Sequence, residues 1–381
     1  MRLFWLALFL APSFAIAQDA EPTTFLKGAK EKSVFDRLWA STRIYENEDN
    51  RVVQSFGIVG RYHGQGWSVA ADQGSADGWE NRRMIFGAES VLFRELTVQA
   101  QIRVSEDFSP FYDGIYQAFV RWSPNESLSI SAGRLDFLFG GLERTKSSNR
   151  IVTFERGLLA DQLTPAEVVG LSTRVNANGF TYRVGLFSGS IGQEFTSFEG
   201  GVGAGVGMEH ALHLFFSSGK VHLDYLFNDG HSLNDALAPY DHVLSMWHEG
   251  RSGPFAMGVD VMAGNGLAGT KSVLGATVLP TYDIRKGILG KDDALQAVLR
   301  WQYAVSDGED GLQLQSRYQQ EVVPSGLGDQ YHAVYGGLNY MIYKDRFKTM
   351  FGAEYSVMNS DALGRASFKG WTYMAGARAF F

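Results

Sequence analysis

Residues 94–105 read RELTVQAQIRVS, and this stretch decides the fold. Every second residue from Leu96 to Val104 is apolar, and the residues between them, from Thr97 to Arg103, are polar. Successive side chains of a β-strand point to opposite faces, so this alternation predicts a strand with one apolar and one polar face. Segments of about ten such residues are typical of strands that have lipid on one side and water on the other.

The same alternation recurs along the chain from Val52 onwards and predicts about 16 strands. Short connections alternate with long ones, as in bacterial barrels with tight periplasmic turns and long extracellular loops. An open sheet edge in hydrocarbon would leave backbone groups without partners, so the sheet has to close. We therefore predict an all-β protein, a transmembrane antiparallel up-and-down β-barrel. The predicted strands are 54–72, 80–92, 94–105, 113–123, 126–135, 167–176, 179–189, 207–217, 219–228, 240–249, 253–264, 271–283, 293–304, 331–343, 346–358 and 369–381.

The composition of the chain argues against several other classes of protein. Beyond Ala17 the chain has no apolar run of about 18 residues, which argues against an α-helical membrane protein. It has no cysteine, so it is not a disulfide-stapled scaffold. Its net charge of −7 gives no general attraction for nucleic acid, and no nucleic-acid partner is expected. A soluble β-rich protein is the alternative that composition alone leaves open.

The two ends of the chain carry their own signals. Residues 1–17 contain Arg2, an apolar run and a small-residue triplet, the form of a secretory signal peptide. Residues 18–51 are charged and mixed, and we interpret them as a periplasmic segment, partly helical or disordered, before the barrel of residues 52–381. The last predicted strand ends on Phe381, and a terminal aromatic strand resembles the signal that outer-membrane assembly machinery recognises.

The connection from about Asp136 to Ala166 is the best candidate for a loop that narrows the pore. It has too many apolar residues for a loop in solvent, which predicts that it folds inward against the wall. An external loop that covers a subunit interface is the alternative. Its cations are mixed with Glu143, Glu155 and Asp161, which could neutralise them. The predicted constriction residues are Arg144, Lys146, Arg150 and Arg156.

If the apolar parity faces lipid, the lumen receives nine cations and four carboxylates, an excess of about five positive charges in an acidic chain. Low-dielectric walls focus such a field, so the pattern favours passage of anions. Arginines that brace the wall by pairing with carboxylates are the alternative interpretation. The predicted lumen cations are Arg61, Arg83, Arg103, Arg121, Arg174, Arg183, Arg300, Lys348 and Arg378; the carboxylates are Glu89, Asp224, Asp260 and Glu354.

The run LFGGLERTKSSNRIVTFERGLLADQLTP, residues 138–165, is similar to the motif of the phosphate-selective porin O and P family. GRYHGQGWSVAADQGSADGWENRRMIFGAE, SEDFSPFYDGIYQAFVRW, PYDHVLS, RWQYAVSDGEDGLQ and the ending GWTYMAGARAFF also resemble that family, so the resemblance covers about Phe35 to Phe381. It implies a 16-stranded barrel that assembles as a homotrimer, with the third loop narrowing each pore and arginines leading anions toward it.

These features predict an outer-membrane porin for passive diffusion of small hydrophilic solutes, with a preference for anions such as phosphate. A non-channel surface barrel, an adhesin or a scaffold that acts through its loops, is the alternative. No nucleophile constellation is visible, so we expect no enzymatic activity. No histidine pair has metal-ligand spacing beside a carboxylate, and we expect neither metal nor cofactor. The glycine-rich run 201–207, GVGAGVG, lacks a strand–helix context for nucleotide binding and is predicted to be a flexible loop.

Overall fold

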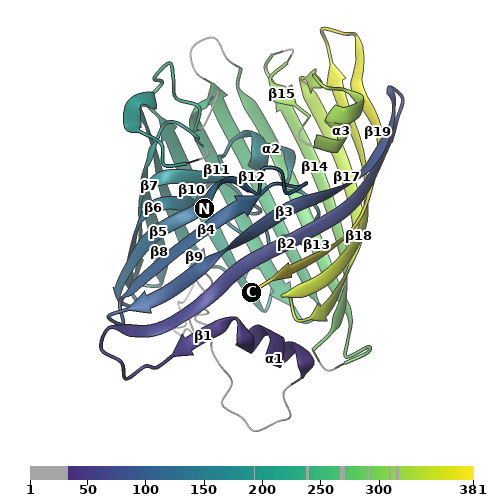
Figure 1. Ribbon diagram of the computed structural model, residues 1–381. Helices are drawn as coiled ribbons and strands as arrows, with labels where there is room; N and C mark the ends of the chain where they lie inside the picture. The colour runs from purple at the N-terminus through teal and green to yellow at the C-terminus, as the bar shows by residue number, and fades with distance from the viewer. Residues whose placement is uncertain are drawn as a thin grey trace, which may run out of the picture.

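The computed structural model describes residues 33–192, 194–236, 240–266, 271–290, 292–308, 310–314 and 317–381. Within these ranges sixteen antiparallel strands, each paired with the next, form a barrel (Figure 1). They are β2 (Val53–Ala71), β3 (Gly74–Leu92), β4 (Leu96–Val104), β5 (Tyr112–Asn125), β6 (Leu128–Asp136), β7 (Glu167–Ala177), β8 (Phe180–Ser188), β9 (Val202–Ala211), β10 (Ser218–Asn228), β11 (Tyr240–Ser252), β12 (Phe255–Gly266), β13 (Val273–Lys286), β14 (Ala294–Ser306), β17 (Gln330–Tyr343), β18 (Phe347–Ser360) and β19 (Arg365–Phe380).

The barrel closes where β19 pairs with β2, from Gly370 opposite Ala71 to Phe380 opposite Arg61. This pairing leaves no free edge along the shared length of the two strands, as a sheet in hydrocarbon requires. The predicted closed barrel of about 16 strands is therefore confirmed.

The outer face of the barrel is apolar. In β4, Val98 is 36% exposed and pairs with the exposed Val120 of β5, whereas their neighbour Gln101 is buried inside the barrel. Further exposed apolar residues follow on the other strands, among them Phe86, Val184, Leu186, Met246, Leu299, Val334 and Phe351. Such a belt is stable only against lipid, because exposure of this much apolar surface to water is strongly unfavourable.

A short N-terminal segment continues the sheet at the end of the barrel where the chain terminates. Strand β1 (Arg43–Glu46) pairs with β2 beside Gly57, beyond the end of β19. Helix α1 (Val34–Ser41) packs beside it, with the Trp39 indole Nε1 donating to the carbonyl of Phe380 at 2.6 Å. The signal-peptide prediction for residues 1–17 lies outside the described residues, as does the beginning of the predicted periplasmic segment 18–51.

The other elements lie in the connections between barrel strands. They are helices α2 (Leu158–Gln162) and α3 (Arg317–Val322), the 3₁₀ turn η1 (Phe198–Gly200), and the short strand pair β15 (Leu312–Gln313) and β16 (Leu327–Gly328). No helix among the described residues is long and apolar enough to cross a membrane.

Several predicted boundaries are wrong, among them the end of the predicted strand 207–217, since β9 stops at Ala211. Strand β3 begins at Gly74 rather than residue 80, since its pairing with β2 continues to a turn at residues 72–73. Strands β18 and β19 are joined by residues 361–364 alone, not by a long loop at 359–368. The run GVGAGVG is a strand rather than a flexible loop, because Val202–Gly207 pairs with β8 and β10.

Candidate functional site in the barrel lumen

Residues 137–166, here called the inner loop, leave β6 and lie inside the barrel before the chain enters β7. Phe137, Phe139, Leu142, Phe154 and Leu163 are each at most 2% exposed. Their burial against inward-facing wall residues explains why this connection is so rich in apolar side chains. α2, the short helix within the inner loop, lies inside the barrel outline in Figure 1.

The first turn of the inner loop is fastened by two carboxylates. Gly140 and Gly141 have φ angles of 77° and 104°, a backbone conformation that favours glycine. This turn aims the Gly140 amide at the Asp224 carboxylate at 3.0 Å and the Leu142 amide at the Asp260 carboxylate at 2.9 Å. Hydrogen bonds from backbone amides to ionised acceptors are among the stronger ones in proteins.

Glycines in the wall make room for the rings of the inner loop. Phe139 packs against Phe187 with ring centroids 5.9 Å apart. A Cβ atom on Gly205 would lie 3.2 Å from the Phe139 ring, and one on Gly185 would lie 3.3 Å from it. The glycine-rich run therefore serves close packing, which is why its inward positions lack side chains.

A chain of ion pairs links the inner loop to the barrel wall. The Arg300 guanidinium binds the Glu143 carboxylate of the inner loop at 3.0 Å and the Glu354 carboxylate of β18 at 2.9 Å. Glu143 also accepts from the amide of Gly157 at 2.6 Å and from the Thr153 hydroxyl at 3.0 Å. These contacts tie the inner loop to both β14 and β18.

Four basic side chains form one straight row across neighbouring strands, here called the basic row. Lys348 of β18 lies opposite Arg378 of β19, which lies opposite His63 of β2, which lies opposite Arg83 of β3. Lys348 and Arg378 place two positive charges directly opposite one another, an arrangement that destabilises a sheet. Such an arrangement persists where it serves a purpose other than stability.

The basic row is bonded to neutral groups. The Lys348 ammonium donates to the carbonyls of Asn149 and Ile151, each at 3.1 Å, and Arg378 donates to the carbonyl of Thr153 at 3.2 Å. Arg83 makes no hydrogen bond or ion pair to any residue that the structure describes. Carbonyl dipoles stabilise a cation without cancelling its charge, so the positive charge of this wall remains.

Beside the basic row lies one paired carboxylate. Arg82 binds Glu155 through its Nε at 2.9 Å. Burial would raise the pKa of the Glu155 carboxyl, but the positive charges of Arg82 and Arg83 outweigh it and hold the pKa well below its usual range. Glu155 is therefore ionised at neutral pH, and Arg82 compensates it.

The predicted constriction residues differ in the groups that their side chains contact. Arg144 pairs with Asp161 at 3.0 Å, and Lys146 pairs with Glu249 of β11. Arg156 donates to the carbonyl of Glu143 at 3.0 Å, and Arg150 is half-buried on the same segment. Arg144 and Lys146 are thus neutralised by carboxylates, so they brace the loop more than they charge the lumen.

The remaining predicted lumen cations lie on other parts of the wall. Arg61 donates to the Ser148 hydroxyl at 2.7 Å, and Arg103 pairs with Glu167 at 3.3 Å. Arg121 donates to the Ser131 hydroxyl at 3.1 Å. Arg174 lies opposite Arg183, which donates to the carbonyl of Leu138 at 3.3 Å.

A second connection also folds inward, and the sequence analysis did not predict it. α3 contributes Tyr318, whose ring centroid lies 5.2 Å from that of Trp67 with the rings tilted, and whose hydroxyl donates to Glu80. Gln319 donates to the Ser356 hydroxyl at 2.7 Å. Arg82 also faces the lumen and was not predicted from the sequence. A bulge opposite Gly64 turns Arg82 as well as Arg83 inward, and a strict alternation does not predict a bulge.

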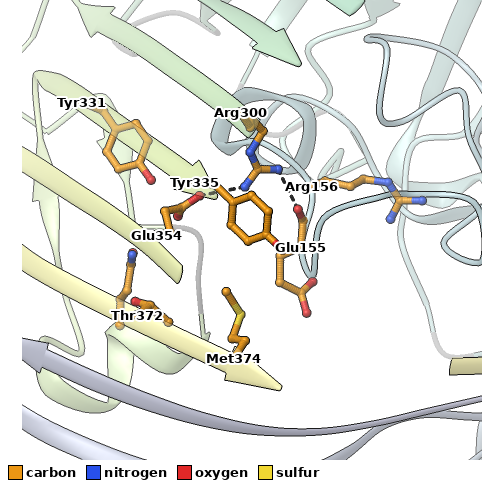
Figure 2. Close-up of a pocket in the computed structure, with 9 residues that line it drawn as sticks. Glu155, Arg156, Arg300, Tyr331, Tyr335, Glu354, Thr372 and Met374 are labelled. Carbon is orange, nitrogen blue, oxygen red and sulfur yellow. Dashed lines mark hydrogen bonds and ion pairs between the residues drawn. The ribbon is translucent and has the colours of Figure 1, made fainter. Parts of the chain in front are cut away.

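Between the inner loop, α3 and strands β14, β17, β18 and β19 lies a small cavity (Figure 2). Arg300 and Glu354 meet on one side of it, and the Tyr335 ring lies beside them in the view. The cavity is lined by Glu155, Arg156, Arg300, Gln319, Tyr331, Tyr335, Glu354, Thr372 and Met374.

Comparison with known proteins gives a fold but no family. No family model matches the chain, and no curated protein sequence matches it. An anion-selective porin from Comamonas acidovorans is 11% identical with a TM-score of 0.59, covering 86% of this chain and 99% of that one. The outer membrane channel DcaP of Acinetobacter baumannii is 12% identical with a TM-score of 0.56, covering 89% and 100%. A trimer form of OmpT, an outer membrane protein of Vibrio cholerae, is 12% identical with a TM-score of 0.52, covering 86% and 99%.

The chain has a porin-like fold. Its closed sheet, its apolar outer belt and the fold that it shares with these outer-membrane proteins agree with the predicted outer-membrane location. The finer assignment to the phosphate-selective porin O and P family finds no support in these comparisons.

Proposed function

We propose that the protein is an outer-membrane porin through which small hydrophilic solutes diffuse passively, with a preference for anions such as phosphate. The basic row carries this proposal: Lys348, Arg378 and Arg83 form no ion pair with a carboxylate among the described residues. Charges in a low-dielectric enclosure raise the local concentration of counter-ions. The planar guanidinium fork suits phosphate-like oxygens. Catalysis forms no part of this function.

The decisive experiment measures ion selectivity in planar bilayers. Under a potassium chloride gradient, the reversal potential of the wild-type protein is expected to have the sign that indicates a preference for chloride over potassium. Arg83→Gln removes one uncompensated charge and should lower the anion-to-cation permeability ratio about threefold, the effect of one charge several ångströms from the path at intermediate dielectric. Arg365→Gln, an exposed cation near the start of β19, is the matched control and should leave the ratio unchanged. Cation preference in the wild type would refute the proposal.

Phosphate preference is a separate measurement with the same protein. Added phosphate is expected to reduce chloride current by competing for the basic row, and Arg83→Gln should weaken that competition. The same result with sulfate at equal strength would limit the preference to anions in general.

Assembly and partners extend the proposal. We infer a homotrimer in outer-membrane lipid, supported by the trimer form among the similar structures, and recognition of the terminal strand ending at Phe381 by the assembly machinery. The non-channel alternative, an adhesin or scaffold, has one observation in its favour: the inner loop and α3 both lie inside the barrel. Stable single-channel openings would exclude it.

A further inference from the structure

Three connections at the end of the barrel opposite α1 are joined into one surface, here called the outer platform. They lie between β4 and β5, between β8 and β9, and between β10 and β11. The Tyr112 hydroxyl at the start of β5 donates to the Glu194 carboxylate of the second connection. The Ile191 amide donates to the Asp235 carboxylate of the third connection at 2.8 Å, and the Asp235 amide donates to the Gly189 carbonyl at 2.8 Å. Hydrogen bonds therefore hold the three connections together.

The inward course of the inner loop explains how these connections meet. Because the connection between β6 and β7 enters the lumen, it leaves the rim of the barrel between β5 and β8 uncovered. The β8–β9 connection crosses this part of the rim, where the Arg134 guanidinium of β6 donates to the Glu194 carbonyl at 2.7 Å. The outer platform is thus a consequence of the same fold that places the inner loop in the lumen.

The outer platform exposes large apolar side chains. In the β4–β5 connection, Phe108 and Phe111 are 58% and 59% exposed. In the β8–β9 connection, Phe195 and Phe198 are 56% and 52% exposed, and Leu233 of the β10–β11 connection is 65% exposed. The apolar belt does not account for them, because the belt lies on the outer faces of the strands and these residues lie beyond the strand ends. Apolar side chains gathered on a surface in water mark a place where another molecule binds.

The connections of the outer platform are also acidic. No Lys or Arg occurs in residues 105–113, 189–201 or 229–236. Glu106 pairs with Arg317 of α3 at 2.9 Å, and the other carboxylates leave the platform with an excess of negative charge. The carboxylates in these ranges are Glu106, Asp107, Asp113, Glu194, Glu199, Asp229 and Asp235.

This negative charge excludes several occupants of the outer platform. A second copy of the same surface, a nucleic acid or a phosphate-bearing lipid would bring like charge to the carboxylates. An uncharged apolar partner would cover the aromatic rings but would strip water from the carboxylates without pairing them, which is unfavourable. A segment that has both apolar and basic side chains covers the rings and pairs with the carboxylates.

We propose that the outer platform is a docking surface for a basic amphipathic segment of another protein outside the cell. Apolar side chains of that segment pack on Phe195 and Phe198, and its lysines or arginines pair with carboxylates such as Asp107 and Glu199. Attraction between opposite charges also speeds the encounter of the two proteins. The inference goes beyond the proposed function and depends on it only for the orientation of the barrel, with the long connections facing out of the cell.

The test measures binding of a defined basic peptide to the full-length protein in nanodiscs of phosphatidylcholine, a lipid without net charge. The probe is a fluorescein-labelled peptide of Lys-Trp-Ser repeats, and its fluorescence anisotropy is recorded at low salt with empty nanodiscs as background. The peptide should bind the wild-type protein. The same peptide with Glu in place of Lys should not bind, because like charges repel, and the version with Ser in place of Trp should bind more weakly.

Two variants of the protein test the two components of the surface. Phe195→Ser with Phe198→Ser should weaken peptide affinity about tenfold, because aromatic side chains supply much of the binding energy at such surfaces. Asp107→Asn with Glu199→Gln should weaken it about threefold at low salt, and by less as salt screens the charges.

The matched control is Leu363→Ser with Asp361→Asn. Both residues are exposed in the β18–β19 turn, at the same end of the barrel but outside the outer platform. Peptide affinity of this control should equal that of the wild type. An equal loss of affinity in the control, or no binding of the Lys peptide above the empty nanodiscs, would overturn the proposal.

Other occupants and the proposed function are tested with the same preparations. Pairing of protein-loaded nanodiscs in analytical ultracentrifugation, abolished by Phe195→Ser with Phe198→Ser, would assign the surface to a second copy instead. Binding of the Glu peptide as tightly as the Lys peptide would show apolar adhesion and reject the charge selection. Chloride conductance is recorded in parallel. Peptide binding without conductance would reject the porin function and leave the outer platform standing, and conductance without peptide binding would do the reverse.

Discussion

The beginning and the middle of the inner loop are held in the lumen by opposite chemistry. At its beginning, backbone amides of Gly140 and Leu142 donate to the carboxylates of Asp224 and Asp260 on β10 and β12. In its middle, backbone carbonyls accept from the Lys348 ammonium and the Arg378 guanidinium on β18 and β19. Acids therefore hold the loop on one wall and bases hold it on the other.

This difference shows how a loop inside a barrel satisfies its backbone and at the same time polarises the lumen. Peptide groups buried away from water need partners, and charged side chains are the strongest partners. On the acidic wall His222 contacts both Asp224 at 2.8 Å and Glu209 at 3.3 Å, and Lys220 pairs with Glu209 at 2.9 Å. The cations of the basic row form no ion pair with a described carboxylate, and the nearby Glu155 is bound by Arg82, so the basic wall keeps an excess of positive charge.

The largest effect is expected when both cations that hold the middle of the inner loop are removed, with Lys348→Met and Arg378→Met together. The carbonyls at residues 148–154 would lose their donors, at about 3 kcal/mol or more in total, since each buried group left without a partner costs about 1–3 kcal/mol. The inner loop should detach there, single-channel conductance should rise, and anion preference should largely disappear. Current recordings under a salt gradient measure both effects.

Arg365→Met serves as the control for this double variant, since Arg365 is exposed on the same strand as Arg378. If conductance and selectivity of the double variant equal those of the wild type, the basic wall neither holds the loop nor selects ions.

A smaller effect of opposite sign is expected from the acidic wall. Asp224→Asn and Asp260→Asn keep an acceptor oxygen but remove its charge, so each should weaken its hydrogen bond by about 1 kcal/mol. Faster hydrogen exchange at the amides of Gly140 and Leu142, followed by NMR, measures the loosening. Anion preference should increase slightly, because negative charge has left the lumen. Asp361→Asn in the exposed β18–β19 turn is the control, and a decrease in anion preference would contradict the two-wall description.

The fold was predictable because a membrane imposes a period of two on every spanning strand. The alternation from Leu96 to Val104 reports that constraint directly, and β4 is where it predicted a strand. The start of β3 at Gly74 was not predictable in this way, because residues 74–79 pair through their backbone with β2 and follow no apolar alternation.

The site was predictable in kind but not in its pairings. The sequence shows that Glu143 and Arg300 are charged, but it does not show that they meet across 157 residues of chain. The cations of the basic row were each predicted to face the lumen, yet their alignment depends on strand register, which one sequence does not reveal. Arg82 was missed because a bulge breaks the parity on which the prediction relied.

The smallest expected effect concerns a carboxylate anchor outside the lumen, where solvent screens it. Hydrogen bonds from Tyr343 and Ser33 lower the pKa of Asp36 in α1 from 3.8 to about 2. A lowered pKa means that the ionised form favours the docked helix, so this stabilisation is complete above about pH 4 and is lost as pH falls through 2. Hydrogen exchange of residues 33–42, corrected for intrinsic rates, should therefore accelerate modestly between pH 4 and pH 2. Asp36→Asn should abolish that pH dependence. Asp224 and Asp260 are buried whereas Asp36 is only half-buried, so an equal acceleration at the Gly140 amide between pH 4 and pH 2 would contradict this difference in shielding.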